Sequence, residues 1–279
     1  MRDTPRPEGT LGDFGPRPPQ LRPGRALAHT PGASGSGSPH RSDSRPPQTP
    51  RGARPSDPDG RPGTTPPVPG RPTSLFLLLG LLGLPALLFT LITWQVVADG
   101  PLADLDEAAG RALIHPDRVS EFLADLGNVP VAVPVLAVAL AYVTWRHHRI
   151  GTHHWWWPAT AAAALMALVP ALIVPLKELT DRPGTPAVPP ATGYYPSGHT
   201  ATAAIAYGAA TLLLLPWLSS APARRALLAL CAVLNLGVGF GLVRRGYHWP
   251  LDVVGSWSLC TVLLVGLWLF LGRSSRPQP

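Results

Sequence analysis

The stretch YYPSGHTATAAIAYGAA, residues 194–210, decides how this chain is interpreted. From Thr200 onward it consists mostly of small and apolar residues, as a membrane-spanning helix can. Its beginning differs, because Pro196 halts any preceding structure and Ser197 is a favoured N-terminal helix cap. Gly198 lets a ligand approach the backbone closely. A helix that starts here presents free N–H groups and the positive end of its dipole, and both attract an anion.

The composition of the whole chain predicts the environment of that helix. Of 279 residues, 46% are hydrophobic and only 14% are charged, which is typical of a membrane domain. Apolar runs of membrane-spanning length recur. There are six: Leu75–Val97, Val129–Trp145, Trp155–Leu176, His199–Leu218, Ala226–Val243 and Leu251–Leu271. We expect an all-α fold, a bundle of six transmembrane helices over residues 74–272, with a disordered N-terminal tail.

Residues 1–73 form that tail. They hold half of the 36 prolines, and 11 arginines against 6 acidic residues. Such a segment buries too little apolar surface to offset the entropy lost on ordering. We expect a disordered cytoplasmic tail, either simply solvated or touching anionic lipids. Residues 273–279 form a second, short cytoplasmic tail.

The distribution of basic residues predicts the topology. With six spans, one side carries the tail, Arg146–Arg149, Arg224, Arg225, Arg273 and Arg276. The positive-inside rule makes this side cytoplasmic, so we expect a multi-pass protein of the cell membrane with both termini inside. The extracellular side carries four further bases against that trend: Lys177, Arg182, Arg244 and Arg245. An anionic ligand held at the outer face explains them.

A second stretch, GYHWPLDVV at residues 246–254, opens the last span in the same way. Asp252 follows His248 by four residues and can orient its imidazole and raise its nucleophilicity. His199, on the first turn of the other helix, can donate a proton. Two helix starts and two histidines near basic groups describe a phosphoryl-transfer site that needs no metal.

These motifs resemble those of the type 2 phosphatidic acid phosphatase superfamily, including its undecaprenyl-pyrophosphate phosphatase-like bacterial members. The resemblance covers about residues 75–271. Pro-Ser-Gly-His at 196–199 matches the middle motif fully, and His248 with Asp252 matches the catalytic end of the last. Lys177 begins the first motif, which also contains Arg182-Pro183.

The resemblance implies a role for each matching residue. His248 would form a phosphohistidine, supported by Asp252, and His199 would protonate the leaving group and later help to activate water. The phosphate oxygens would be held by Lys177, Ser197 and the Gly198 N–H.

Two motif arginines are displaced in this chain. The family's first motif reads Lys-x6-Arg-Pro, and Arg182 stands two places early. The third reads Ser-Arg-x5-His, and this chain has Gly241 and Leu242 at the first two places. Arg182, from a flexible loop, and Arg245, one helical turn past Leu242, are expected to reach the same phosphate. Arg244 lies beside Arg245 as a further candidate.

The expected function is hydrolysis of a polyprenyl or glycerolipid phosphate or diphosphate by an integral-membrane lipid phosphatase, without metal or cofactor. The displaced arginines motivate one alternative, a non-catalytic membrane protein that binds lipid phosphate. A phosphotransferase using the same phosphohistidine is another. The expected partners are the lipid phosphate and membrane lipids, and no nucleic acid.

Two further segments are assigned structural roles. Residues 103–126 have helical periodicity and a break near Pro116, which predicts an amphipathic segment lying on the outer interface. Four histidines near the loop between the second and third spans have spacings that suit no standard metal site: His147, His148, His153 and His154. We expect them to be interface residues.

Overall fold

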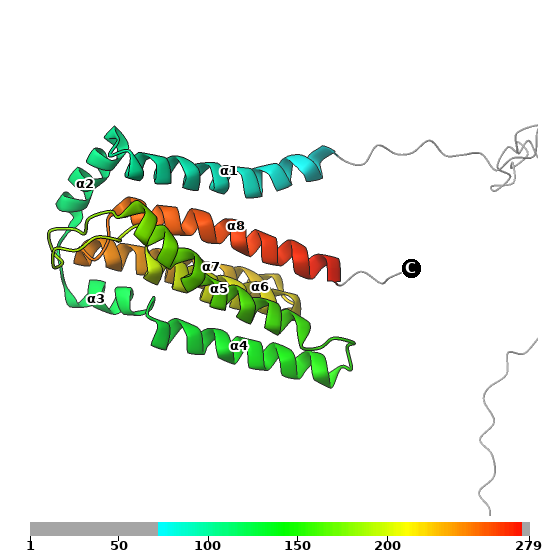
Figure 1. The fold of residues 1–279 in the computed structure, drawn as a ribbon. Coiled ribbons are helices and arrows are strands. Elements are labelled where there is room, and N and C mark those ends of the chain that lie inside the picture. The colour runs from blue at the N-terminus through cyan, green and yellow to red at the C-terminus, as the bar shows by residue number, and fades with distance from the viewer. Residues whose placement is uncertain (1–71, 275–279) are drawn as a thin grey trace, which may run out of the picture. The chain divides into compact units, whose positions relative to one another are not determined.

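The computed structural model describes residues 72–274 (Figure 1). Every regular element in that range is helical. The elements are α1 (Pro72–Val97), α2 (Pro101–Leu113), α3 (Arg118–Asp125), α4 (Val129–Arg149), α5 (Trp157–Thr180), α6 (Gly198–Leu214), η1 (Leu215–Trp217), α7 (Ala221–Arg245) and α8 (Pro250–Ser274). The predicted tails lie almost wholly outside the described residues, so they stay predictions.

Six of these helices, α1 and α4 to α8, are long and apolar enough to cross a membrane. The predicted all-α fold with six spans is therefore confirmed. The predicted bounds were too short for the second and fifth spans, because α4 continues to Arg149 and α7 runs from Ala221 to Arg245. Long arginine side chains can extend toward headgroups while the backbone stays helical, so an apolar run marks less than the whole helix.

Helix α6 lies at the centre of the bundle, and most of its residues are buried. It packs against α4, α5, α7 and α8. Its small side chains permit this, since a Cβ added at Gly208 would lie 2.5 Å from Leu264 Cδ1 of α8. Small residues let helix backbones approach closely in membranes, where no water drives apolar groups together. The helix that begins with Gly198-His199 is thus surrounded by the others.

Helix α1 lies at the periphery, along α8 (Figure 1). Only a short part of it is buried, where Ile92 and Val96 contact Tyr195. Most of its large apolar side chains, such as Phe76 and Leu84, are exposed in the isolated chain. Such a surface is expected of a helix that faces lipid on most sides.

The predicted amphipathic segment forms two helices, α2 and α3, with the predicted break between them. Asp117 starts α3 as its N-cap, and its side chain accepts a hydrogen bond of 2.7 Å from the Ser120 N–H. Asp117 also accepts from Arg244 Nε of α7, at 2.7 Å. The Ser120 N–H and then Arg244 lower the pKa of the Asp117 carboxyl to about 2. This helix start is therefore tied to the end of α7 by a carboxylate that stays ionised at neutral pH.

Helix α3 packs closely on α7 because α7 has a glycine at the crossing. A Cβ added at Gly241 would lie 2.5 Å from the Ala124 backbone nitrogen and 2.7 Å from the Ser120 carbonyl oxygen. Both atoms belong to backbone, so a side chain at position 241 cannot be accommodated by a change of rotamer. Gly241 is thus what admits α3.

We predict that Gly241→Ala lowers the stability of the folded protein by about 1–3 kcal/mol, the usual cost of overpacking. Thermal unfolding in detergent measures the change. Gly266→Ala in α8 is the matched control, because a Cβ there meets nothing within 4 Å. If both variants melt like the wild type, the α3–α7 contact does not require the glycine.

Candidate active site

The two predicted catalytic histidines come together at one end of the bundle. His199 lies in the first turn of α6, and His248 lies two residues before α8. Both side chains line the same two pockets. This brings together residues 49 positions apart in sequence, because α6 and α8 begin at the same end (Figure 1).

His248 and Asp252 form the expected pair. The Nδ1 atom of His248 lies 3.1 Å from Oδ2 of Asp252, whose side chain is fully buried. The same oxygen accepts a hydrogen bond of 3.0 Å from the Trp249 N–H. With a proton on Nδ1 facing the carboxylate, Nε2 of His248 keeps its lone pair and can act as a nucleophile.

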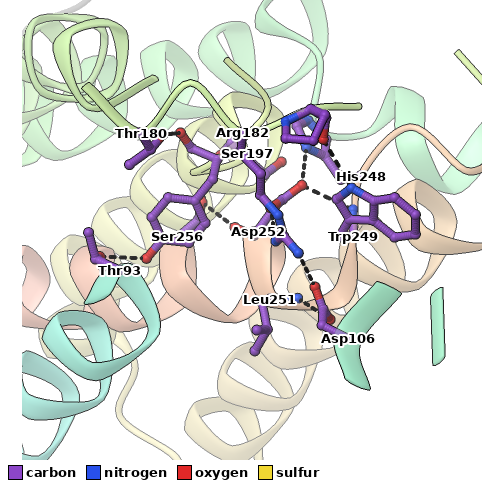
Figure 2. Close-up of polar contacts among 12 residues, drawn as sticks. Thr93, Asp106, Thr180, Arg182, Ser197, His248, Trp249, Leu251, Asp252 and Ser256 are labelled. Carbon is purple, nitrogen blue, oxygen red and sulfur yellow. Dashed lines mark hydrogen bonds and ion pairs between the residues drawn. The ribbon is translucent and has the colours of Figure 1, made fainter. Parts of the chain in front are cut away.

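Arg182 contacts this pair through Asp252, as Figure 2 shows. Its Nη1 donates to Oδ1 of Asp252 at 2.6 Å, and its Nη2 donates to Oδ2 of Asp106 at 2.7 Å. The guanidinium is buried and lines neither pocket. Arg182 was expected to reach a phosphate from a flexible loop, and the structure instead places it between two carboxylates.

Asp106 was not singled out by the sequence analysis. It lies on α2, one of the two helices of the amphipathic segment, and it is buried at 5% exposure. Its Oδ1 accepts from the Leu251 N–H at 2.9 Å, so it also binds the first turn of α8. A signal was present, since Ala103, Asp106 and Gly110 share one helical face otherwise made of small residues.

In this cluster, burial and the neighbouring charges shift the pKa values of Asp106 and Arg182 in opposite directions. Burial raises the pKa of the Asp106 carboxyl, and the bonds from Arg182 and Leu251 offset only part of that effect. Burial alone would lower the pKa of Arg182, but Asp252 and Asp106 outweigh it and the net shift is upward. The guanidinium therefore stays charged between the two carboxylates.

The starts of α6 and α8 are bonded directly to each other. The Ser197 N–H donates to the Asp252 carbonyl at 3.1 Å, and Ser256 Oγ donates to the Ser197 carbonyl at 2.9 Å. Ser197 is the N-cap predicted from the sequence, because its Oγ accepts from the Thr200 N–H at 3.3 Å. It is fully buried. Its side chain thus holds the helix start in shape.

The N–H groups of Gly198 and His199 have no hydrogen-bond partner among residues 72–274. Gly198 and His199 line the larger pocket together with Lys177. The Lys177 Nζ donates to the Gly193 carbonyl at 2.8 Å. Two free N–H groups at a helix start, beside an ammonium, form a site suited to an anion.

Arg244 and Arg245 do not face this anion site. Helix α7 continues to Arg245, as the sequence analysis required, but both guanidinium groups bind α3. Arg244 binds Asp117 at 2.7 Å, and Arg245 binds Glu121 and lies 3.3 Å from the Tyr247 hydroxyl. Arg244 and Arg245, which were expected to bind phosphate, are thus paired with carboxylates at the start of α3.

The two pockets that meet at His199 and His248 differ in character. The larger, of about 880 Å³, extends between α4, α5 and α6 and is mostly apolar. Away from the histidines it is lined by residues such as Val133, Leu136, Leu140, Met166, Ile173 and Val174. The smaller, of about 390 Å³, has polar lining groups from α3, from the turn that follows it and from the turn after α7: Glu121, Asp125, Asn128 and Tyr247. One pair of histidines therefore contacts an apolar and a polar compartment.

The four histidines at residues 147–154 lie at or near the junction of α4 and α5, away from this site. Among residues 72–274, no group of three His, Cys, Asp or Glu side chains is arranged to hold a metal ion. The expectation of a site without metal or cofactor stays a prediction.

Comparison with known proteins supports this architecture. Residues 159–276, which contain α5 to α8, match the model of the PAP2 superfamily. The structure is similar to a crystal structure described as the first transmembrane PAP2 type phosphatidylglycerolphosphate phosphatase from Bacillus subtilis. The TM-score is 0.58 at 23% identity, over 70% of this chain and 98% of that chain. No curated protein matches the sequence.

We predict that Ser197→Ala and Ser220→Ala each lower stability by about 1 kcal/mol, the usual loss for an N-cap. Ser220 is a matched control, because its Oγ accepts from the Ala223 N–H at 3.3 Å in the same way at the start of α7. Thermal unfolding measures both losses. Only Ser197→Ala should also weaken binding of inorganic phosphate. If both variants bind phosphate equally well, Ser197 is not part of the anion site.

Proposed function

Because residues 159–276 match the model of the PAP2 superfamily, we propose that this multi-pass membrane protein is a lipid phosphatase. The observation that carries the proposal is the pairing of His248 with buried Asp252, at 3.1 Å, facing His199 across a shared pocket. We infer that it hydrolyses a polyprenyl or glycerolipid phosphate or diphosphate.

The proposed reaction has two displacement steps at phosphorus. The Nε2 lone pair of His248 attacks, a P–N bond forms, and the P–O bond to the leaving group breaks as His199 supplies its proton. Asp252 stabilises the positive charge that develops on the imidazole. A water molecule, deprotonated by His199, then attacks phosphorus and breaks the P–N bond. Inorganic phosphate leaves and His248 is regenerated.

The free N–H groups at the start of α6 supply the proposed phosphate-binding site. Donors that are already oriented stabilise negative charge without reorganisation during the reaction. Lys177 lines the same pocket and adds a flexible positive charge. Arg182, Arg244 and Arg245 are not part of this proposed phosphate-binding site, since each is paired with carboxylates.

The apolar pocket supports a lipid as the substrate. Its lining between α4 and α5 suits a hydrocarbon chain, whose burial contributes about 0.8 kcal/mol per CH₂ group. Its polar end holds Gly198, His199 and Lys177. A molecule with a phosphate at one end and a long apolar chain at the other matches this division.

The polar pocket favours one second candidate, a phosphotransferase. It reaches both histidines from the side of α3 and is large enough for a small alcohol as well as for water. An alcohol bound there would accept the phosphoryl group from His248 in place of water. The third possibility, a protein that only binds lipid phosphate, gives no reason for the His248–Asp252 pair.

We propose that the site faces the extracellular side. The basic residues Arg146–Arg149 end α4, whereas the pocket-lining Val129 begins it. A helix of 21 residues is about 31 Å long, the thickness of a bilayer core. The positive-inside rule therefore assigns the Arg146–Arg149 end to the cytoplasm and the histidines to the outer face.

The function is tested by phosphate release from purified protein, offered polyprenyl phosphates and diphosphates, phosphatidate and soluble phosphates, with EDTA present. We expect release from lipid phosphates only. His248→Ala should abolish it, and His199→Ala should lower kcat by about a hundredfold or more, as for loss of a general acid. Undiminished release by His248→Ala would contradict the mechanism. Transfer to added glycerol would favour the phosphotransferase.

A second experiment tests the assignment of Arg245. If it only holds α3, Arg245→Ala and Glu121→Ala should each reduce kcat/KM slightly and by similar factors, because each breaks the same ion pair. Loss of a donor to the transition state would cost roughly a hundredfold. Such a loss in Arg245→Ala alone would show that this guanidinium leaves Glu121 to bind phosphate.

A further inference from the structure

We propose that Asp106 and Arg182 are positioning residues that act through Asp252 on the reactivity of His248. The inference rests on the phosphatase function proposed above and adds to it a residue of α2, outside the matched family region. It also gives Arg182 a role that does not involve contact with phosphate.

The contacts form a continuous chain from α2 to the nucleophile (Figure 2). Asp106 Oδ2 binds Arg182 Nη2 at 2.7 Å, and Arg182 Nη1 binds Asp252 Oδ1 at 2.6 Å. The other oxygen of Asp252 lies 3.1 Å from His248 Nδ1. No side chain in this chain of contacts is more than 7% exposed. Water therefore screens these charges little.

Helix α2 is held in place by contacts other than the ion pair. Gly110 admits Trp249, since a Cβ there would lie 2.5 Å from the indole Cε3 atom. The Leu251 N–H donates to Asp106 Oδ1. The guanidinium of Arg111, also on α2, lies 6.0 Å from the centroid of the Trp249 ring. Helix α2 thus fixes the position of Asp106 at the start of α8.

The charges in the buried cluster determine whether it makes His248 more or less basic. Two carboxylates share one guanidinium, so this three-residue cluster carries one excess negative charge. That excess favours positive charge on the His248 imidazole, whether from a proton or from a bound phosphoryl group. Without the Asp106 charge, Arg182 would neutralise Asp252, and His248 would become less basic and less nucleophilic.

Other ionisable groups near His248 belong to several elements. They are Lys177 of α5, Tyr194 and Tyr195 of the loop before α6, His199 of α6, Glu121 and Asp125 of α3, and Arg244, Arg245 and Tyr247 at the end of α7. The substitutions proposed below leave all of these unchanged, so the difference between variants reports the Asp106–Arg182–Asp252 cluster.

The test is the pH dependence of kcat and kcat/KM for lipid phosphate hydrolysis by the full-length protein. In Asp106→Asn we expect kcat to fall about tenfold, and the acid limb of kcat/KM to move to lower pH by about one unit, equivalent to a tenfold change in proton affinity. Asp104→Asn, the same change at an exposed position of α2, should leave both unchanged. Asp106→Glu, which keeps the charge, should keep the acid limb near its wild-type position.

The double variant Asp106→Asn/Arg182→Gln separates charge from shape. It removes one charge of each sign and leaves Asp252 without a cation, so the acid limb should return to the wild-type pH or above it. If Asp106 and Arg182 have only a structural role, the double variant should lose further activity and its acid limb should not return to the wild-type pH. An unmoved acid limb in Asp106→Asn, or a double variant that stays at the lower pH, would overturn the proposal.

A readout that needs no turnover separates this inference from the proposed function. The ¹⁵N signals of His248, assigned by comparison with His248→Ala, should titrate at lower pH in Asp106→Asn than in the wild type. If the wild type releases no phosphate but this shift appears, the proposed function fails and the inference stands. If the wild type is active and the shift is absent, the inference fails alone. If Asp106→Asn does not fold, the double variant is compared with the wild type, and a titration at lower pH than the wild type contradicts the inference.

Discussion

The hydrogen bond from the Ser197 N–H to the Asp252 carbonyl joins the starts of the two helices that carry the site. This bond fixes where the starts of α6 and α8 lie relative to each other. It places the free N–H groups of α6 near the histidine that precedes α8. It is available because both helices begin at the same end of the bundle, each with a residue suited to a helix start, Ser197 as cap and Pro250 as first residue. Small residues along α6 then let α8 run beside it.

Much of this could be predicted from the sequence, for local physical reasons. Six apolar runs predicted six spans, the spacing of His248 and Asp252 predicted their contact, and Ser197 predicted a cap. The His248–Asp252 contact and the Ser197 cap each depend on residues within a few positions of one another. The spans depend only on the preference of apolar side chains for lipid over water. The roles of these residues in catalysis stay predictions, because contact geometry alone does not establish turnover.

The partners of the basic residues could not be predicted in the same way. Arg182 meets Asp106 across 76 positions, and Arg244 meets Asp117 across 127. The sequence shows that Arg182, Arg244 and Arg245 lie in the segments that flank the two histidines, but not which acids approach them. Those pairings depend on how closely α2 and α3 pack on α8 and α7, and Gly110 and Gly241 permit that approach. Arg182, Arg244 and Arg245 are thus each paired with a carboxylate from the segment that contains α2 and α3, and Arg182 is paired with Asp252 as well.

The meeting of two unlike pockets at one pair of histidines bears on the direction of the reaction. In a phosphatase built this way, the two products have different destinations: the lipid alcohol is soluble in the bilayer and inorganic phosphate in water. Each would depart through the compartment in which it dissolves. The products would then rarely meet again at the enzyme, so dilution into two separate phases, rather than a large change in bond energy, would keep hydrolysis running forward.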